Sequence, residues 1–191
     1  MSKARLETFS DGVIAIIITI MVLEMRVPHG TDLAALRPLI PVFLSYVLSF
    51  AFLAIYWNNH HHLLHATKRV TGSIMWANAH LLFWLSLIPF ATAWYGENHG
   101  GPWPTALYGL VLLMAAVAYT LLQTAIVASQ GKDSHLAASL GSDVKGKASL
   151  AGYIAAIALA FKLPWLSAAL YVAVALLWLM PDYRIERLPE S

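Results

Sequence analysis

The sequence predicts an all-α membrane protein with six transmembrane helices in one domain over residues 1–191. Of the 191 residues, 59% are hydrophobic and only 12% are charged. A soluble domain has about 45–50% apolar and about 25% charged residues. The apolar residues also gather in stretches near the roughly 20 residues that a helix needs to cross a bilayer. A soluble globular domain is therefore excluded.

Each apolar stretch gives one predicted helix, except the last, which gives two. The stretch from Ala148 to Met180 is too long for one straight crossing, and Lys162 and Pro164 interrupt it, because proline disfavours helix in the residue before it. The first stretch carries no small-x-small cleavage site, so we expect it to remain as a helix. The predicted helices are about 8–26, 38–62, 73–95, 103–128, 148–162 and 164–180.

The cations favour one side of the membrane. If six helices alternate in direction, nine of the 12 lysine and arginine side chains fall on one side and three on the other. The larger set is Lys3, Arg5, Lys68, Arg69, Lys132, Lys145, Lys147, Arg184 and Arg187. The smaller set is Arg26, Arg37 and Lys162. Because cytoplasmic loops carry the excess of cations, we predict a multi-pass protein of the plasma membrane with both termini in the cytoplasm.

Several functional classes are excluded by what the sequence lacks. There are no cysteines, and the net charge of +2 comes without a basic stripe, so neither thiolate chemistry nor a nucleic-acid partner is expected. His60, His61, His62 and His65 cluster at one helix end, but no second histidine box exists. We interpret them as interfacial residues or a proton-sensitive gate rather than a fixed metal site. We therefore expect no enzyme, no cofactor and no small-molecule substrate.

The first predicted helix carries an apolar stripe and a carboxylate on different faces. On an ideal helix the stripe is about 100° wide and contains Ile16, Thr19, Ile20 and Leu23. Asp11 projects about 140° away from Ile16. A carboxylate inside a span costs about 2.5–3.5 kcal/mol on insertion scales, so it normally faces partners. An apolar face at this spacing more often packs against other helices than it contacts ions.

The start of this helix resembles a known signature. Arg5, Phe9, Ser10 and Asp11, followed by an isoleucine-rich helix, resemble the RxxxFSD signature of the lysosomal potassium channel family (transmembrane protein family 175) and its prokaryotic relatives. The resemblance extends over the first three predicted helices. Its further matching residues are Trp57 and His60 at the end of the second helix, and Asn78, Pro89 and Phe90 in the third.

The resemblance implies a potassium-permeable cation channel. In that family the first helix of each six-helix unit lines a central pore with apolar residues, and chains with one unit form homotetramers. By position, the family's narrowest isoleucine ring falls on Ile16, and Thr19, Ile20 and Leu23 extend the path. The sequence has no Thr-Val-Gly-Tyr-Gly filter. The implied partners are other copies of the chain and the lipid bilayer, and potassium is the permeant ion.

The other signature residues are predicted to support the first helix. Ser10 and Asp11 project away from the stripe, toward neighbouring helices. Trp57, His60 and Asn78 offer the polar groups that a buried carboxylate needs. We therefore predict a network centred on Asp11 that joins the first three helices. Arg5 projects on the side of Ile16, about 16 Å below it, so it lies either at the pore mouth or beside Asp11.

A proton-coupled secondary transporter is the alternative function. Asp11 would then be the group that binds and releases the proton. The absence of an inverted repeat and of helices broken at the midplane speaks against a transporter, as does the position of Asp11 near one helix end.

Overall fold

The computed structural model describes residues 2–130 and 143–179, and every regular element in those ranges is helical. The described residues do not include Met180, at the end of the last predicted helix. They also do not include three cations assigned above to the cytoplasmic side, Lys132, Arg184 and Arg187. The elements are α1 (Lys3–Leu23), the 3-10 helix η1 (Leu33–Leu39), α2 (Ile40–His65), α3 (Gly72–Ser86), α4 (Ile88–Glu97), α5 (Pro102–Gln130), α7 (Val144–Leu159) and α8 (Pro164–Leu179).

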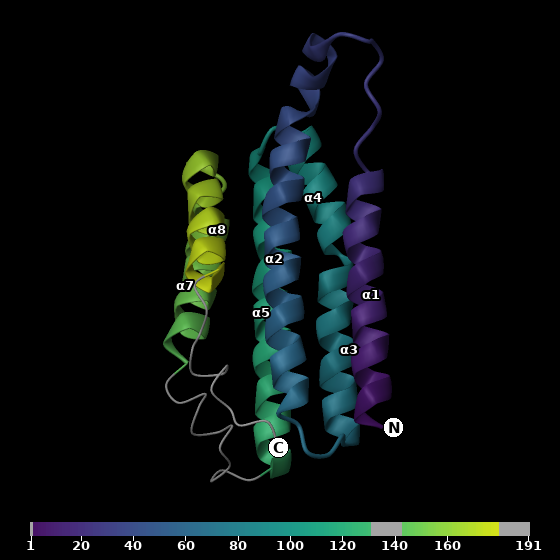
Figure 1. Ribbon diagram of the computed structural model, residues 1–191. Coiled ribbons are helices and arrows are strands. Elements are labelled where there is room, and N and C mark those ends of the chain that lie inside the picture. The colour runs from purple at the N-terminus through teal and green to yellow at the C-terminus, as the bar shows by residue number, and fades with distance from the viewer. Residues whose placement is uncertain (1, 131–142, 180–191) are drawn as a thin grey trace.

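The helices form an up-and-down bundle with α1 on one side and the α7–α8 pair on the opposite side (Figure 1). α1 packs against α2, α3 and α4, while α5 packs against α3, α4 and α7. η1 and the start of α2 extend beyond the end of α1 (Figure 1). α1 is therefore a peripheral helix, and one of its faces remains uncovered in a single chain.

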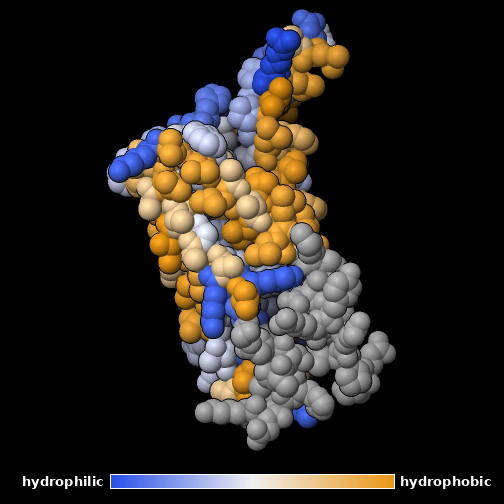
Figure 2. All heavy atoms as spheres, turned by 90° about the vertical axis from the view of Figure 1, so that its left-hand side faces the viewer, coloured by the Kyte–Doolittle hydropathy of each residue, from blue (hydrophilic) through white to orange (hydrophobic). Residues whose placement is uncertain are grey.

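Within residues 2–130 and 143–179, four helical segments are long and apolar enough to cross a bilayer. They are Lys3–Leu23, Leu33–His65, Gly72–Glu97 and Pro102–Gln130. α7 and α8 have 16 residues each, about 24 Å of helix, and form a shorter hairpin beside them. Seen from the α7–α8 side, hydrophobic residues cover a broad area between hydrophilic residues above and below (Figure 2). The prediction of an all-α membrane protein is confirmed.

α1 begins five residues before the predicted start at 8 and ends three residues before the predicted end at 26. Ser2 caps it, because its side chain accepts a hydrogen bond from the backbone N–H of Arg5 at 3.4 Å. The cap extends the helix through the polar residues that precede the apolar stretch. The complete RxxxFSD segment is thus helical, and its residues take fixed angular positions on α1.

The predicted third helix, 73–95, consists of two segments, α3 and α4. α3 ends at Ser86, Leu87 caps it, and α4 begins at Ile88 with Pro89 in its first turn. Proline has no backbone N–H and its ring clashes with the preceding turn, so it is accepted at the start of a helix but not within one. Pro89 therefore places the break, and α4 leaves α3 in a new direction (Figure 1).

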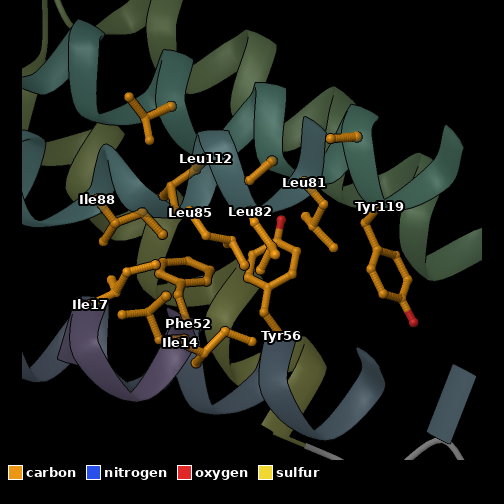
Figure 3. Close-up of a cluster of buried hydrophobic side chains, with 14 of the residues drawn as sticks. Ile14, Ile17, Phe52, Tyr56, Leu81, Leu82, Leu85, Ile88, Leu112 and Tyr119 are labelled. Atoms are coloured by element: carbon orange, nitrogen blue, oxygen red, sulfur yellow. The ribbon is translucent and has the colours of Figure 1, made fainter. Parts of the chain in front are cut away.

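The core lies where α1, α2, α3 and α5 meet (Figure 3). Ile14 and Ile17 of α1 are 1% and 3% exposed, and Phe52 of α2 is 1% exposed. Leu85 of α3 and Leu112 of α5 are fully buried. The buried positions of α1 recur every three or four residues, so α1 presents one stripe to the centre.

A second, polar set of contacts joins α2, α4 and α5 toward the end of the bundle where α5 begins. The Ser49 hydroxyl of α2 lies 2.7 Å from the Thr92 hydroxyl of α4 and 2.9 Å from the Tyr108 hydroxyl of α5. All three side chains are buried. Within the described residues, every buried side-chain nitrogen and oxygen has a hydrogen-bond partner. An apolar bilayer requires this, since no water is there to satisfy such groups.

α8 approaches α5 closely at a glycine. A Cβ atom on Gly109 would lie 2.8 Å from Tyr171 Cζ and 2.9 Å from Ile157 Cγ1. The Tyr171 hydroxyl, from α8, donates a 3.0 Å hydrogen bond to the carbonyl oxygen of Thr105 in α5. Gly109 therefore lets the tyrosine ring cross the surface of α5.

Gly109→Ala is expected to lower thermal stability because the new methyl group displaces Tyr171 and breaks its bond to Thr105. Overpacking of this kind costs about 1–3 kcal/mol. The matched control is Gly72→Ala, where the added Cβ has no atom of another part of the chain within 4 Å. Thermal unfolding followed by intrinsic tryptophan fluorescence measures both. Equal unfolding temperatures for the two variants would contradict the packing described for Gly109.

Candidate functional site

α1 has one buried and one exposed face. Its buried side chains are Leu6, Ser10, Ile14, Ile17 and Met21. These positions follow one another at three- or four-residue steps and face α2, α3 and α4. The remaining face is exposed and, from Ile16 to Leu23, mostly apolar.

The exposed face carries the stripe predicted from the sequence. Ile16 is 59% exposed, Ile20 is 40% exposed and Leu23 is 79% exposed. Thr19 is exposed as well, and its hydroxyl donates a 2.8 Å hydrogen bond to the carbonyl oxygen of Ile16. This bond uses the hydroxyl hydrogen, so the oxygen lone pairs remain available to a cation.

A groove runs along the exposed face where α1 meets the α3–α4 break. It has a volume of about 430 Å³. Ile16, Ile20 and Glu24 line it from α1, and Pro89 and Phe90 line it from α4. Phe90 is itself 63% exposed. The apolar surface beside Ile16 therefore continues onto α4, and Glu24 marks its end.

The opposite face of α1 is held by three buried polar side chains. Asn78 Nδ2 of α3 donates a 2.9 Å hydrogen bond to Ser10 Oγ of α1. Asn78 Oδ1 lies 2.6 Å from His60 Nε2 of α2. Ser10 is fully buried and the other two are 1% exposed. Ser10 Oγ also donates a 2.8 Å bond to the carbonyl oxygen of Leu6, so its hydrogen-bonding groups are occupied.

Asp11 forms a separate contact. Its Oδ1 accepts a 3.0 Å hydrogen bond from Trp57 Nε1 of α2. Asp11 is half-buried, and Trp57 is 46% exposed. The polar residues of the first three helices are thus arranged as the chain Ser10–Asn78–His60 and the pair Asp11–Trp57. Asn78 is the central residue, because one side chain bonds both α1 and α2.

Arg5 and Phe9 lie on the exposed side of α1. Phe9 is 58% exposed, and Arg5 is exposed too. Phe9 precedes Ile16 by seven residues, which on an ideal helix is about 20° from the same direction. The four signature residues therefore separate into two pairs: Ser10 and Asp11 bond neighbouring helices, whereas Arg5 and Phe9 extend the exposed stripe.

The seven-residue spacing between Phe9 and Ile16 is enough to predict that Phe9 lies on the exposed stripe, although the motif groups Phe9 with Ser10 and Asp11. A fixed run of adjacent letters suggests one site, but neighbouring residues on a helix project about 100° apart. Phe9 and Ser10 consequently point to different surroundings. Gly12 is also exposed on α1, and no atom lies within 4 Å of a Cβ placed there.

The histidine cluster is an aromatic stack at the end of α2. The His61 ring centroid lies 6.3 Å from that of Trp57 and 6.2 Å from that of His65. The Lys3 ammonium donates to the backbone carbonyl of His65, which ties the start of α1 to the end of α2. Among the residues that the structure describes, no group of three or more histidine, cysteine or acidic side chains is placed to hold a metal ion.

Asn78→Ala is expected to destabilise the protein more than Asp11→Ala. It removes two buried contacts, whereas Asp11→Ala removes one half-exposed contact; a hydrogen bond between helices contributes about 1–2 kcal/mol at most in a membrane. Asn58→Ala is the control, since Asn58 is exposed on α2. Thermal unfolding of the three variants in detergent gives the order. A larger loss for Asp11→Ala than for Asn78→Ala would restore Asp11 as the central residue.

Comparisons with known proteins find similarity to ion channels. The family model described as endosomal/lysosomal potassium channel TMEM175 matches residues 5–89, which contain most of α1, all of α2 and α3, and the start of α4. A potassium channel of Chryseobacterium sp. is 52% identical over 187 residues, covering 98% of this chain and 97% of that protein. The endosomal/lysosomal proton channel TMEM175 of Homo sapiens is 34% identical over 103 residues, 48% of this chain and 20% of that protein.

A solved structure extends the likeness to nearly the whole fold. The crystal structure of a lysosomal potassium-selective channel TMEM175 homolog from Chamaesiphon minutus superposes with a TM-score of 0.83 at 27% identity, covering 94% of this chain and 97% of that chain. The family is one of channels and not of enzymes. With a relative 52% identical along almost the entire chain, the protein belongs to the TMEM175 channel family.

Proposed function

We propose that this protein is a potassium-permeable cation channel whose pore is lined by α1. The observation that carries the proposal is the exposed apolar face of α1, with Ile16 59% exposed at mid-helix. α1 has 21 residues, about 31 Å of helix, enough to cross the hydrocarbon core. The similar proteins from Chryseobacterium and Chamaesiphon are named as potassium channels.

A homotetramer provides the pore that one chain lacks. Four copies arranged around an axis would bring four Ile16 side chains together and cover the exposed faces of α1 and α4. Such an apolar ring forms a narrow constriction at which ions lose water and which closes by dewetting. Phe9 and Phe90, which are 58% and 63% exposed in one chain, would become buried between copies.

Thr19 supplies the oxygen ligands nearest to that ring. Its hydroxyl lies on the exposed stripe and already donates to the Ile16 carbonyl oxygen. In four copies the Thr19 oxygens would accept a partly dehydrated cation just beyond the constriction. Potassium is then a transient ion in the pore, and the protein needs neither a resident metal nor a cofactor.

We further propose that both termini face the cytoplasm of a plasma-membrane protein. Lys3, Arg5, Lys68 and Arg69 lie near the start of α1 and the α2–α3 connection, at one end of the bundle. α7 begins in the half of the bundle nearer to that end (Figure 1), and its first turn carries two further lysines. The opposite end has Arg26, Arg37 and Lys162. This asymmetry supports the orientation, because cytoplasmic segments are rich in lysine and arginine.

A proton-coupled carrier is the second candidate function, because Asp11 is a titratable carboxylate within a span. The geometry favours it less. Asp11 is about 12 Å from the start of α1 and its Oδ1 is engaged by Trp57. A carrier site needs access from both sides in turn, whereas Asp11 lies on the side of α1 away from Ile16.

Flux from liposomes separates the two functions. Potassium should leave down its own gradient, without a proton gradient, and at rates that do not saturate like those of a carrier. Potassium efflux is measured with an ion-selective electrode and proton movement with an enclosed pH dye. Strict coupling of potassium to protons would contradict the channel, and proton flux without potassium flux would reassign the permeant ion.

Cysteine substitution at adjacent isoleucines tests the pore face. The chain has no cysteine, so Ile16→Cys and Ile17→Cys each introduce a single thiol. Ile16 is 59% exposed and Ile17 is 3% exposed, and we expect a charged thiol reagent to block current only in Ile16→Cys. Ile16→Asn should also change conductance and ion preference. If modification of both cysteines, or of Ile17→Cys alone, blocks the current, α1 presents another face to the ions.

A further inference from the structure

The two ends of α1 carry opposite fixed charge. At the end distant from the N-terminus, Glu24 caps the helix directly after the exposed stripe. On an ideal helix it projects within about 40° of Ile20, and it lines the end of the groove beside Ile16 and Ile20. Glu24 is exposed, and within the part of the chain that the structure describes no ion pair or side-chain hydrogen bond engages its carboxylate.

The nearest cation in the sequence is held by a different acid. Arg26 Nη2 lies 3.6 Å from Glu97 Oε1 at the end of α4. This pair offsets its own charges and draws the arginine toward α4. The side chains of Glu24, Arg26 and Glu97 together leave one net negative charge per chain at this end of α1.

The backbone of α1 adds further negative charge at the same end. The last carbonyl groups of a helix carry about half a negative elementary charge, and α1 ends here at Leu23. Its first turn, at the opposite end, carries the corresponding positive charge together with Lys3 and Arg5. Arg5 projects within about 20° of Ile16 on an ideal helix. The exposed stripe thus runs between a cationic end and an anionic end.

We propose that Glu24 sets the conduction rate and the direction of easier ion flow, as an anionic ring at the outer mouth of the channel. This rests on the proposed function, in which α1 lines a tetrameric pore. Four Glu24 carboxylates and four helix ends raise the local cation concentration at the outer mouth, while Arg5 lowers it at the inner mouth. Cations therefore enter more readily from outside, and the channel passes inward current more easily than outward current.

The effect depends on salt in a predictable way. Exposed charges act over a screening length of about 30 Å at 0.01 M salt and about 3 Å at 1 M. In equal salt on both sides, the ratio of inward to outward current at equal and opposite voltages should be at least about twofold near 0.01 M. The ratio should approach one near 1 M, because the ring then no longer attracts ions from the solution.

The test places a negative or a positive charge at residue 24. Glu24→Cys removes the carboxylate, and the absence of native cysteines confines modification to this position. At low salt the current ratio of Glu24→Cys should fall toward one. A sulfonate-bearing methanethiosulfonate added outside should restore it, and a trimethylammonium-bearing reagent of similar size should invert it. Sustained current throughout shows that the variant is folded and assembled.

Lys162→Cys is the matched control, because Lys162 is exposed at the α7–α8 turn, on the same predicted side but across the bundle from α1. Its modification should leave the ratio unchanged. An unchanged ratio in Glu24→Cys, equal effects of the two reagents, or the same response in Lys162→Cys would overturn the role of Glu24. A wild-type protein that passes no current would instead overturn the proposed channel itself.

Discussion

The rotation of α1 about its own axis is the constraint on which the rest of the structure depends. Asn78 binds Ser10 on α1 and contacts His60 on α2, and all three groups are buried where no water replaces them. A change of one residue in the register of α1 would turn the helix by about 100° and leave these groups unpaired. Because Ser10 must face α3, Ile16 must face away from the bundle. The buried hydrogen bond between Ser10 and Asn78 thus determines which apolar face of α1 is exposed.

Because α1 has a buried polar contact on one face and an apolar exposed face on another, adjacent signature residues have different roles. Ser10 and Asp11 fix the helix, whereas Arg5 and Phe9 share the exposed side with Ile16. The polar contacts of Ser10 and Asp11 with neighbouring helices lie in the N-terminal half of α1. Farther along, Ile17 and Met21 continue the buried stripe, and the α3–α4 break at Pro89 opens the groove beside Ile20. The proposed conduction path and the contacts that support it therefore lie on two faces of one helix.

The sequence was sufficient for the fold class and the apolar stripe, because each leaves a periodic or compositional signal. It did not predict that the helix expected over 73–95 divides into α3 and α4. It was insufficient for the ends of α1, since Ser2 extends the helix through polar residues that composition assigns to a loop. The sequence also predicted that Asp11 is the centre of the polar network. In the structure Asn78 is the residue that bridges α1 and α2. Ser49, Thr92 and Tyr108 gave no signal, because single hydroxyl groups in apolar helices follow no period and their pairing depends on how α2, α4 and α5 pack.

The central claim is that four copies of α1 meet with Ile16 at the narrowest point. An electron-microscopy reconstruction of the protein in lipid nanodiscs, viewed down its symmetry axis, tests this most directly. The proposed assembly has four-fold symmetry, with α1 innermost, Ile16 nearest the axis and the α7–α8 pair outermost toward lipid. An assembly whose axis is lined by another helix, or in which Ile16 contacts lipid, would contradict the claim.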